Sequence, residues 1–257
     1  MKITLNDNKI INIQKYNTSM KKSLEEKAFF LEKIEATSFI DYGCADGALL
    51  SYIQSIKTAP SNRFMGYDIE PEMLKIAKEN SEGILFTDNL DLVKTVKTDK
   101  SVLILSSIIH EIYSYDNANS FWKDVFDKID TKYIVIRDMM IDNSQRRMSN
   151  ADDVKKVRMS NNKLLEEYEN NWGPIDLNKS LIQFLLKYRY TENWERELQE
   201  NYLPLTVEQL IAKIPKNYRI AYRNHYTPSY LKNMVKKDFG IDLTEQTHLQ
   251  MIIEKIE

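Results

Sequence analysis

The fold of this chain is decided by one short stretch, Phe39-Ile40-Asp41-Tyr42-Gly43-Cys44-Ala45-Asp46-Gly47-Ala48-Leu49-Leu50. An apolar segment ends at an acid, a turn of small residues follows, and a helical pattern begins at Ala48. Such a turn lets backbone N–H groups and a helix N-terminus face a ligand with no side chains in the way. The stretch therefore predicts a strand, a ligand-binding loop and a helix in succession.

Acids also follow the next two segments that have the pattern of strands. Asp68 follows Arg63–Tyr67, and Asp88 follows Ile84–Phe86. An acid at the end of the second strand suits hydrogen bonding to a ribose diol and would repel a 2′-phosphate. An acid after the third strand can accept a hydrogen bond from an exocyclic adenine amine. Because parallel strands end at one edge of a sheet, these two acids and Asp41 outline a site for adenosine.

Strand and helix patterns alternate over the first two-thirds of the chain. The expected strands are Thr37–Tyr42, Arg63–Tyr67, Ile84–Phe86, Val102–Ser106 and Tyr133–Ile136. The expected helices are Met20–Ile34, Ala48–Ile56, one that begins at Pro71, Leu90–Val96 and Asn117–Ile129. This alternation predicts an α/β fold, with a Rossmann-like, mostly parallel sheet and helices on both faces.

The pattern becomes helical after residue 141. The polar segment 142–163 is expected to be a mobile lid or an exposed helix. Further helices are expected at Leu164–Tyr168, Leu181–Tyr190, Glu192–Tyr202 and Val207–Ile214, the last opened by a capping box of Thr206 and Gln209. Strands are expected again at Tyr218–Tyr222 and Leu249–Glu254. With no repeat and no linker, the sequence predicts one domain, 1–257, with a helical insertion, 141–214, that is a candidate substrate cap.

Composition excludes several classes of protein. Lys and Arg total 36 against 38 Asp and Glu, and hydrophobic residues make up 42%, so the chain is neither disordered nor basic throughout. No apolar run reaches the roughly 18 residues of a membrane span, and no secretory signal is evident. We therefore expect a cytoplasmic protein without a membrane partner. One cysteine and three scattered histidines give no disulfide framework and no metal-binding spacing.

The motif Asp41-x-Gly43-x-Ala45-x-Gly47 resembles the first motif of class I S-adenosylmethionine-dependent methyltransferases. Asp68 and Asp88 are similar to the acids of this family that bind ribose and adenine. The resemblance covers 37–138 well and 216–257 loosely, and it implies a seven-stranded sheet and S-adenosylmethionine as the cofactor. Many family members carry glycine where this chain has Ala45.

The resemblance also implies which residues contact the cofactor. They are Asp41, Gly43, Ala45, Gly47, Asp68, Ile69, Asp88, Asn89 and Ser106. A nicotinamide dehydrogenase is disfavoured because its G-x-G-x-x-G pattern would fall on Gly43, Ala45 and Ala48, where only the first residue fits. A phosphate-binding P-loop is excluded because its motif does not occur in the chain.

Candidate catalytic residues follow the fourth expected strand. The stretch 104–111 is similar to the strand and loop that face the methyl donor and the substrate in the family. The sulfonium is already a strong electrophile, so the protein must mainly align a nucleophile with the methyl group. His110 is a general base, a substrate contact or a packing residue. Glu111 holds a substrate amine, orients His110 or is a solvated acid. Arg137 binds substrate or forms a salt bridge with Asp138.

Two further stretches bear on the methyl acceptor. In 185–197 we predict substrate contacts for Tyr188, Arg189 and Trp194, against the alternative of an amphipathic helix pair with Tyr188 in its core. The stretch 213–237 carries seven Lys or Arg, no Asp or Glu, and four tyrosines. Such a stretch either binds nucleic acid or forms a solvated basic surface.

The leading hypothesis is a methyltransferase that acts on an oxygen or nitrogen of a small molecule. Amino-methylation of DNA bases is disfavoured because the chain has no Pro-Pro pair, and pyrimidine C5 methylation because Cys44 lies inside the cofactor loop. An RNA methyltransferase acting on tRNA or rRNA through 213–237 is the first alternative. A non-catalytic module that binds S-adenosylmethionine is the second.

Overall fold

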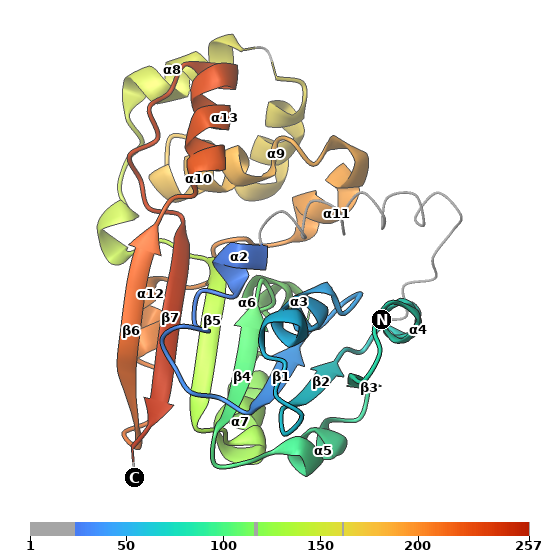
Figure 1. The fold of residues 1–257 in the computed structure, drawn as a ribbon. Helices are drawn as coiled ribbons and strands as arrows, with labels where there is room; N and C mark the ends of the chain where they lie inside the picture. Colours follow the sequence, from blue (N-terminus) through green and yellow to red (C-terminus); the bar gives the residue numbers. More distant parts are fainter. Residues whose placement is uncertain (1–23, 116–117, 161, 257) are drawn as a thin grey trace.

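The computed structural model describes residues 24–115, 118–160 and 162–256, which form a single seven-stranded sheet of order β3-β2-β1-β4-β5-β7-β6 (Figure 1). The strands are β1 (Ser38–Tyr42), β2 (Arg63–Tyr67), β3 (Leu85–Thr87), β4 (Ser101–Ser106), β5 (Tyr133–Met139), β6 (Tyr218–Tyr226) and β7 (His248–Lys255). β1 to β5 are parallel, and β7 runs antiparallel to β5 and β6. The predicted mostly parallel, seven-stranded α/β sheet is confirmed.

Helices cover both faces of this sheet. They are α2 (Leu24–Lys27), α3 (Ala48–Ile56), α4 (Pro71–Asn80), α5 (Leu90–Val93), α6 (Ile109–Tyr115), α7 (Ala118–Lys123) and a π-helical turn, η2 (Asp124–Ile129). Leu103 of β4 packs in the cluster that α5 and α7 cover, whereas Ile104 packs in the cluster that α3 and α4 cover. Since both faces are buried, the central strands are nearly continuous apolar runs.

The expected helix Met20–Ile34 differs from the structure. Residues 20–23 lie outside the described residues, and α2 ends at Lys27, where turns take over. Lys27, Ala28, Phe30 and Leu31 are all buried. Lys27, Phe30 and Leu31 have the i, i+3, i+4 spacing of one helical face, which is why the sequence pattern indicates a longer helix than the structure contains. Asn117, the expected start of another helix, also lies outside the described residues.

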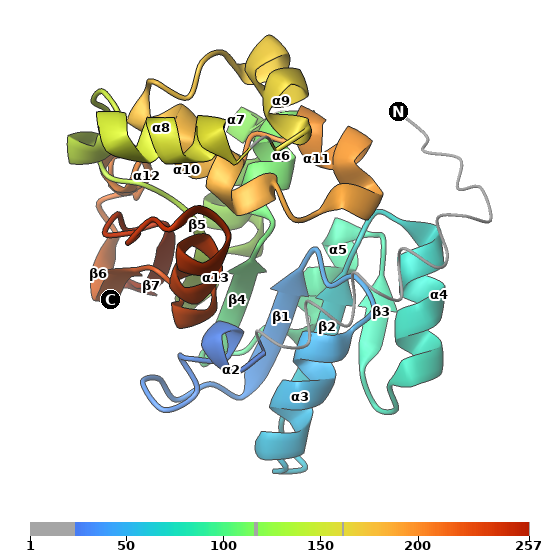
Figure 2. The ribbon, with the colours of Figure 1, turned by 90° about the horizontal axis from the view of Figure 1, so that it is seen from above.

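A group of helices between β5 and β6 stands above the carboxyl ends of the parallel strands (Figures 1 and 2). They are η3 (Asn143–Gln145), α8 (Ala151–Met159), α9 (Leu164–Trp172), α10 (Asn178–Lys187), η4 (Thr191–Asn193) and α11 (Trp194–Gln199). The next helix, α12 (Val207–Ile211), lies alongside the sheet, and its Val207 and Leu210 belong to the same cluster as Leu103. We call α8 to α11, together with α13 (Ser229–Phe239) from between β6 and β7, the cap. Its hydrophobic core is separate from the two cores of the sheet.

The cap differs from expectation in two respects. The segment 142–163 contains a regular helix, α8, which buries Val154 and Val157 and begins at an Asn150 N-cap. Its apolar stripe is two residues wide, too narrow to stand out in a charged sequence. α13 was missed, yet its Leu231 and Val235 lie in the cap core. The capping box predicted at Thr206 is present at the start of α12.

Candidate active site

The loop after β1 turns through left-handed backbone three times. Gly43, Ala45 and Gly47 have φ values of 77°, 46° and 75°. The N–H of Gly43 donates to the carbonyl oxygen of Tyr67 at 2.8 Å, which ties the loop to β2. A Cβ atom on Gly43 would lie 2.6 Å from Cδ1 of Ile108. The loop therefore requires glycine at position 43 both for its backbone angles and for close packing against the segment after β4.

Asp68, directly after β2, holds this loop in place through hydrogen bonds with backbone N–H groups. One carboxylate oxygen accepts from the N–H of Ala45 at 2.8 Å, and the other accepts from the N–H of Glu70 at 3.0 Å. Burial raises the pKa of Asp68, and these backbone donors oppose the rise. Asp68 thus fixes the loop as well as lying where the predicted ribose contact should be.

The other predicted adenosine contacts lie at the same edge of the sheet. Asp41 is buried at the end of β1, and Asp88 is exposed just after β3. Asn89 is exposed and caps α5 by accepting from the N–H of Asp91 at 2.9 Å. Ile69, which follows Asp68, is 72% exposed. The three acids therefore lie at the carboxyl ends of three adjacent strands, as the sequence pattern predicts.

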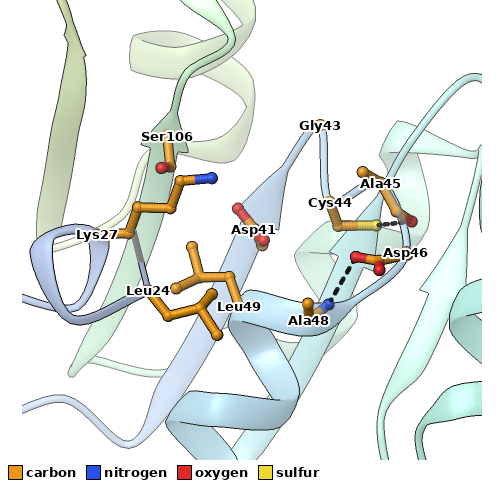
Figure 3. Close-up of a pocket in the computed structure, with 10 residues that line it drawn as sticks. All are labelled: Leu24, Lys27, Asp41, Gly43, Cys44, Ala45, Asp46, Ala48, Leu49 and Ser106. Carbon is orange, nitrogen blue, oxygen red and sulfur yellow. Dashed lines mark hydrogen bonds between the residues drawn. The ribbon is translucent and has the colours of Figure 1, made fainter. Parts of the chain in front are cut away.

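A pocket opens between α2, the loop after β1 and the end of β4 (Figure 3). It is lined by Leu24, Lys27, Asp41, Gly43, Cys44, Ala45, Asp46, Ala48, Leu49 and Ser106. Burial lowers the pKa of Lys27 to about 8, and burial raises that of Asp41 to about 7. The pocket thus places a cation and a carboxylate within electrostatic range of each other in surroundings from which water is largely excluded.

Sequence reasoning missed Lys27 and Asp46 as pocket residues. One signal was present, because Lys27 falls on the apolar side of the expected helix, beside Leu24, Ala28 and Leu31. A lysine on the buried face of a helix needs a partner for its charge, so its position indicates a functional role.

Ser106 contributes an unsatisfied group to the pocket wall. Its hydroxyl is buried, and within the described residues it has no hydrogen-bond partner. A buried hydroxyl without a partner is costly, and native structures rarely keep one without a reason. Cys44 also lines the pocket, but burial raises the pKa of its thiol, so it is not a nucleophile.

His110 and Glu111 lie on helix α6 and not in a loop. The imidazole Nδ1 of His110 lies 2.8 Å from Oδ1 of Asp138, and its ring is buried. Burial lowers the pKa of His110, but the charge of Asp138 outweighs this effect and raises it to about 9. The expectation that Glu111 orients His110 is corrected, because Asp138 does so and Glu111 pairs with Arg196 at 3.1 Å.

The expected salt bridge between Arg137 and Asp138 does not form. Successive residues of β5 point to opposite faces of the sheet, so the two side chains are separated. Arg137 instead pairs with Glu26 of α2 at 2.9 Å and is buried. Its Nε has no hydrogen-bond partner within the described residues. Arg137 stands in register with Ser106 of β4, so it lies next to the pocket.

The predicted substrate contacts in the cap fall in two environments. Tyr188 and Trp194 are buried in the cap core, where Tyr188 donates to Asp238 at 2.7 Å and Trp194 donates to Glu167 at 2.8 Å. Arg189 lies close to the sulfur of Met234 of α13. The two aromatic residues therefore stabilise the cap, as in the alternative of an amphipathic helix pair.

The basic stretch 213–237 divides between β6 and α13. Tyr218 is buried and bonded to Asp130, Tyr222 packs on Phe29, and Tyr226 donates to Glu26 at 3.2 Å. Tyr230 is 54% exposed. Three of the four tyrosines are thus engaged in the fold itself.

Two kinds of feature are absent from the described residues. No group of three or more His, Cys, Asp or Glu side chains there is arranged to hold a metal ion. No helix in the same part of the chain is both long and apolar enough to cross a bilayer.

Comparison with known proteins places this architecture. Residues 33–95 match the family model described as a methyltransferase domain. The plantazolicin methyltransferase BamL, solved with a triazolic desmethylPZN analog and SAH, has a TM-score of 0.55 at 13% identity, over 96% of this chain and 89% of its own. BpumL with SAH has a TM-score of 0.52 at 12% identity, over 96% and 88%. The search of curated proteins found no match.

A third structure of the same architecture is the methyltransferase domain of bacterial CtHen1-C. Its TM-score is 0.52 at 12% identity, and the match covers 92% of this chain and 98% of that one. The fold is therefore that of the class I S-adenosylmethionine-dependent methyltransferases, and the resemblance seen in the sequence is confirmed. The predicted methyltransferase activity and cofactor agree with these findings.

Proposed function

We propose that this protein transfers a methyl group from S-adenosylmethionine to an oxygen or nitrogen atom of a small molecule. The observation that carries the proposal is the pocket of Figure 3, where Lys27, Asp41 and the unsatisfied hydroxyl of Ser106 face one space beside the loop after β1. When bound there, the cofactor supplies an electrophilic methyl group on a sulfonium.

The charges of the pocket suit the amino-acid end of this cofactor. Its methionine moiety is a zwitterion, and a site for a zwitterion needs one cation and one anion. Lys27 would hold the carboxylate, Asp41 would hold the ammonium group, and Ser106 would gain the hydrogen bond that it lacks. Asp68 and Asp88 extend along the neighbouring strand ends, where they would accept from the ribose hydroxyls and the adenine amine. The residues present therefore fit the cofactor.

The acceptor would enter beside β4 and β5. Arg137 stands next to Ser106 across the two strands, and its uncommitted Nε–H is suited to hold an oxygen atom of the acceptor. Ser107 follows Ser106 with a left-handed φ of 58° and lies 3.4 Å from Nη1 of Arg137. Strained backbone of this kind gathers at functional sites. These side chains would position the acceptor, while the cap would exclude water.

A small-molecule acceptor is favoured by how the basic stretch is used. Arg219 of β6 pairs with Glu254 at 2.6 Å, and Lys236 of α13 pairs with Asp242 at 2.5 Å. With most of its tyrosines engaged in the fold, 213–237 offers few of the stacking faces that single-stranded RNA requires.

Two measurements test the proposal. Calorimetric titration with S-adenosylhomocysteine should show one saturable site per chain. Incubation with methyl-labelled S-adenosylmethionine should then label a compound in a pool of small metabolites, and ribonuclease should not remove the label. Labelled RNA would overturn the small-molecule acceptor, and saturable binding without any labelled acceptor would favour a non-catalytic module.

A further inference from the structure

His110 lies between two carboxylates that belong to different parts of the molecule. Its Nδ1 faces Asp138 of β5 at 2.8 Å, and its Nε2 faces Glu200, just after α11 of the cap, at 4.0 Å. All three side chains are at most 6% exposed. The contact with Asp138 is a hydrogen bond and that with Glu200 has the distance of an ion pair. A neutral imidazole has only one N–H and presents it to one carboxylate, whereas an imidazolium presents an N–H to each.

The carboxylate on the sheet side is held by the backbone. Oδ2 of Asp138 accepts from the N–H of Ile109 at 2.8 Å, and Oδ1 accepts from the N–H of Met139 at 2.7 Å. These two donors and His110 keep the pKa of Asp138 below its ordinary value against the opposing effect of burial. Asp138 is therefore an anion in a fixed position that orients the imidazole from the side of the sheet.

The carboxylate on the cap side belongs to a segment that docks onto α6. Glu200 accepts from Nε of Arg196 at 2.7 Å and from the hydroxyl of Tyr115 at 3.3 Å. Arg196 also reaches Glu111, and the N–H of Asn201 donates to Ser114 at 2.8 Å. Figure 2 shows α11 beside α6. Residues 196–202 are thus the cap segment that contacts the helix directly after β4.

Other groups that face His110 agree with a positive charge on its ring. The ring of Tyr202 meets it edge to face at 5.2 Å, and Glu111 of α6 adds a third nearby carboxylate. Arg196 opposes the charge only from beyond Glu200 and Glu111, which it bridges. His248 of β7 is also within electrostatic range, but burial and neighbouring cations hold its pKa well below 6.5, so it stays neutral.

We propose that His110 is a positioning residue, an imidazolium that contacts Asp138 on the sheet and Glu200 on the cap. We call this three-residue arrangement the joint. It fixes the position of residues 196–202 above the end of β4. His110 is not the base that removes a proton from the methyl acceptor, since its Nδ1 is hydrogen-bonded to Asp138, its Nε2 faces Glu200, and an imidazolium has no lone pair with which to accept a proton. The statement that His110 is not the base rests on the proposed function, whereas the existence of the joint does not depend on it.

The protonation of His110 is measured directly on the full chain. The sequence has three histidines, so the ring-nitrogen NMR spectrum is simple, and His110→Gln assigns the signal. Both nitrogens of His110 should carry protons at pH 7.5, with a titration midpoint above pH 8. A neutral ring at pH 7.5 would overturn the proposal. Neither cofactor nor acceptor is needed, so failure to bind S-adenosylhomocysteine would count only against the proposed function.

The contact between His110 and Glu200 is tested by removing the charge of Glu200. Glu200→Gln should lower the midpoint of His110 by at least half a pH unit and speed amide hydrogen exchange in 196–202 at least fivefold, with α3 unchanged. Glu195→Gln is the matched control, because Glu195 is an exposed acid on α11, the helix that Glu200 follows. If Glu200→Gln does not fold, Tyr115→Phe removes one partner of Glu200 and should speed the same exchange more modestly. Unchanged exchange in a folded Glu200→Gln protein would contradict the joint.

Discussion

Asp68 accepts a hydrogen bond from the backbone N–H of Ala45 at 2.8 Å, so the acid after β2 and the loop after β1 form one unit. The same carboxylate lies where the ribose of the cofactor would be. Asp68 therefore has two tasks, since it holds the loop in shape and offers oxygen atoms to the ligand.

Asp68→Asn tests the second task while keeping the size of the side chain. We expect affinity for S-adenosylhomocysteine to fall by about 1–3 kcal/mol, roughly 5- to 150-fold, because a charged acceptor is lost in a half-buried site. Calorimetry measures the change. Asp99→Asn is the control, because Asp99 is an exposed acid away from the pocket. Equal affinities for the two variants would refute the assignment of Asp68.

Gly43→Ala separates backbone strain from close packing when it is compared with Gly240→Ala. Both glycines have a left-handed φ, but a Cβ atom at Gly240 would meet nothing within 4 Å, whereas at Gly43 it would collide with Ile108. We expect Gly240→Ala to cost about 1–2 kcal/mol of unfolding free energy. Gly43→Ala should cost more and also abolish ligand binding. Denaturant titration provides the comparison, and equal costs would contradict the close approach to Ile108.

Ser106→Ala should have opposite effects on stability and on binding. Without ligand, removal of a buried hydroxyl that lacks a partner should leave the melting temperature unchanged or raise it. Affinity for S-adenosylhomocysteine should fall by about 1 kcal/mol, the net value of one hydrogen bond. Thermal melts with and without ligand measure both effects. A variant that is less stable and binds normally would show that Ser106 is only structural.

His110 should make stability depend on pH in a defined direction. Its pKa of about 9 in the folded protein exceeds the ordinary value near 6.5, so its stabilising contribution is complete below about pH 6.5 and is lost as pH rises to about 9. The loss is about 1.4 kcal/mol per pH unit in that window. Unfolding free energies of wild type and His110→Gln should therefore converge between pH 6.5 and 9.

Comparison with His110→Gln removes the contributions of other titrating groups. Lys27, for example, acts in the opposite sense, because its lowered pKa of about 8 makes the fold gain stability between about pH 8 and 10.5. A constant gap between wild type and His110→Gln across the window would mean that His110 is neutral in the folded state.

The sheet was predictable because its signals are local. β2 begins and ends where its apolar pattern does, and α3 matches its expected bounds. The cap was harder, because α13 reaches it from between β6 and β7, and no local pattern shows that Leu231 packs against residues some 50 positions earlier. Burial of that kind is a property of the tertiary structure.

The candidate site was also predictable only in part. The acids after β1, β2 and β3 were predictable from their positions at strand ends. The partner of His110 was not, since Asp138 and Glu200 come together only through sheet register and cap docking. Arg137 and Asp138 are adjacent in sequence, but the alternation of a strand separates their side chains. The roles of His110 and Arg137 therefore depend on charge pairs between distant elements, which the sequence alone does not reveal.

The most direct test of the account is calorimetric titration of the full chain with S-adenosylhomocysteine, with NAD as the competing dinucleotide. We expect one site per chain for S-adenosylhomocysteine, with binding weakened in Asp68→Asn and unaffected by NAD. Saturable binding of NAD, or no binding of S-adenosylhomocysteine by a folded protein, would contradict it.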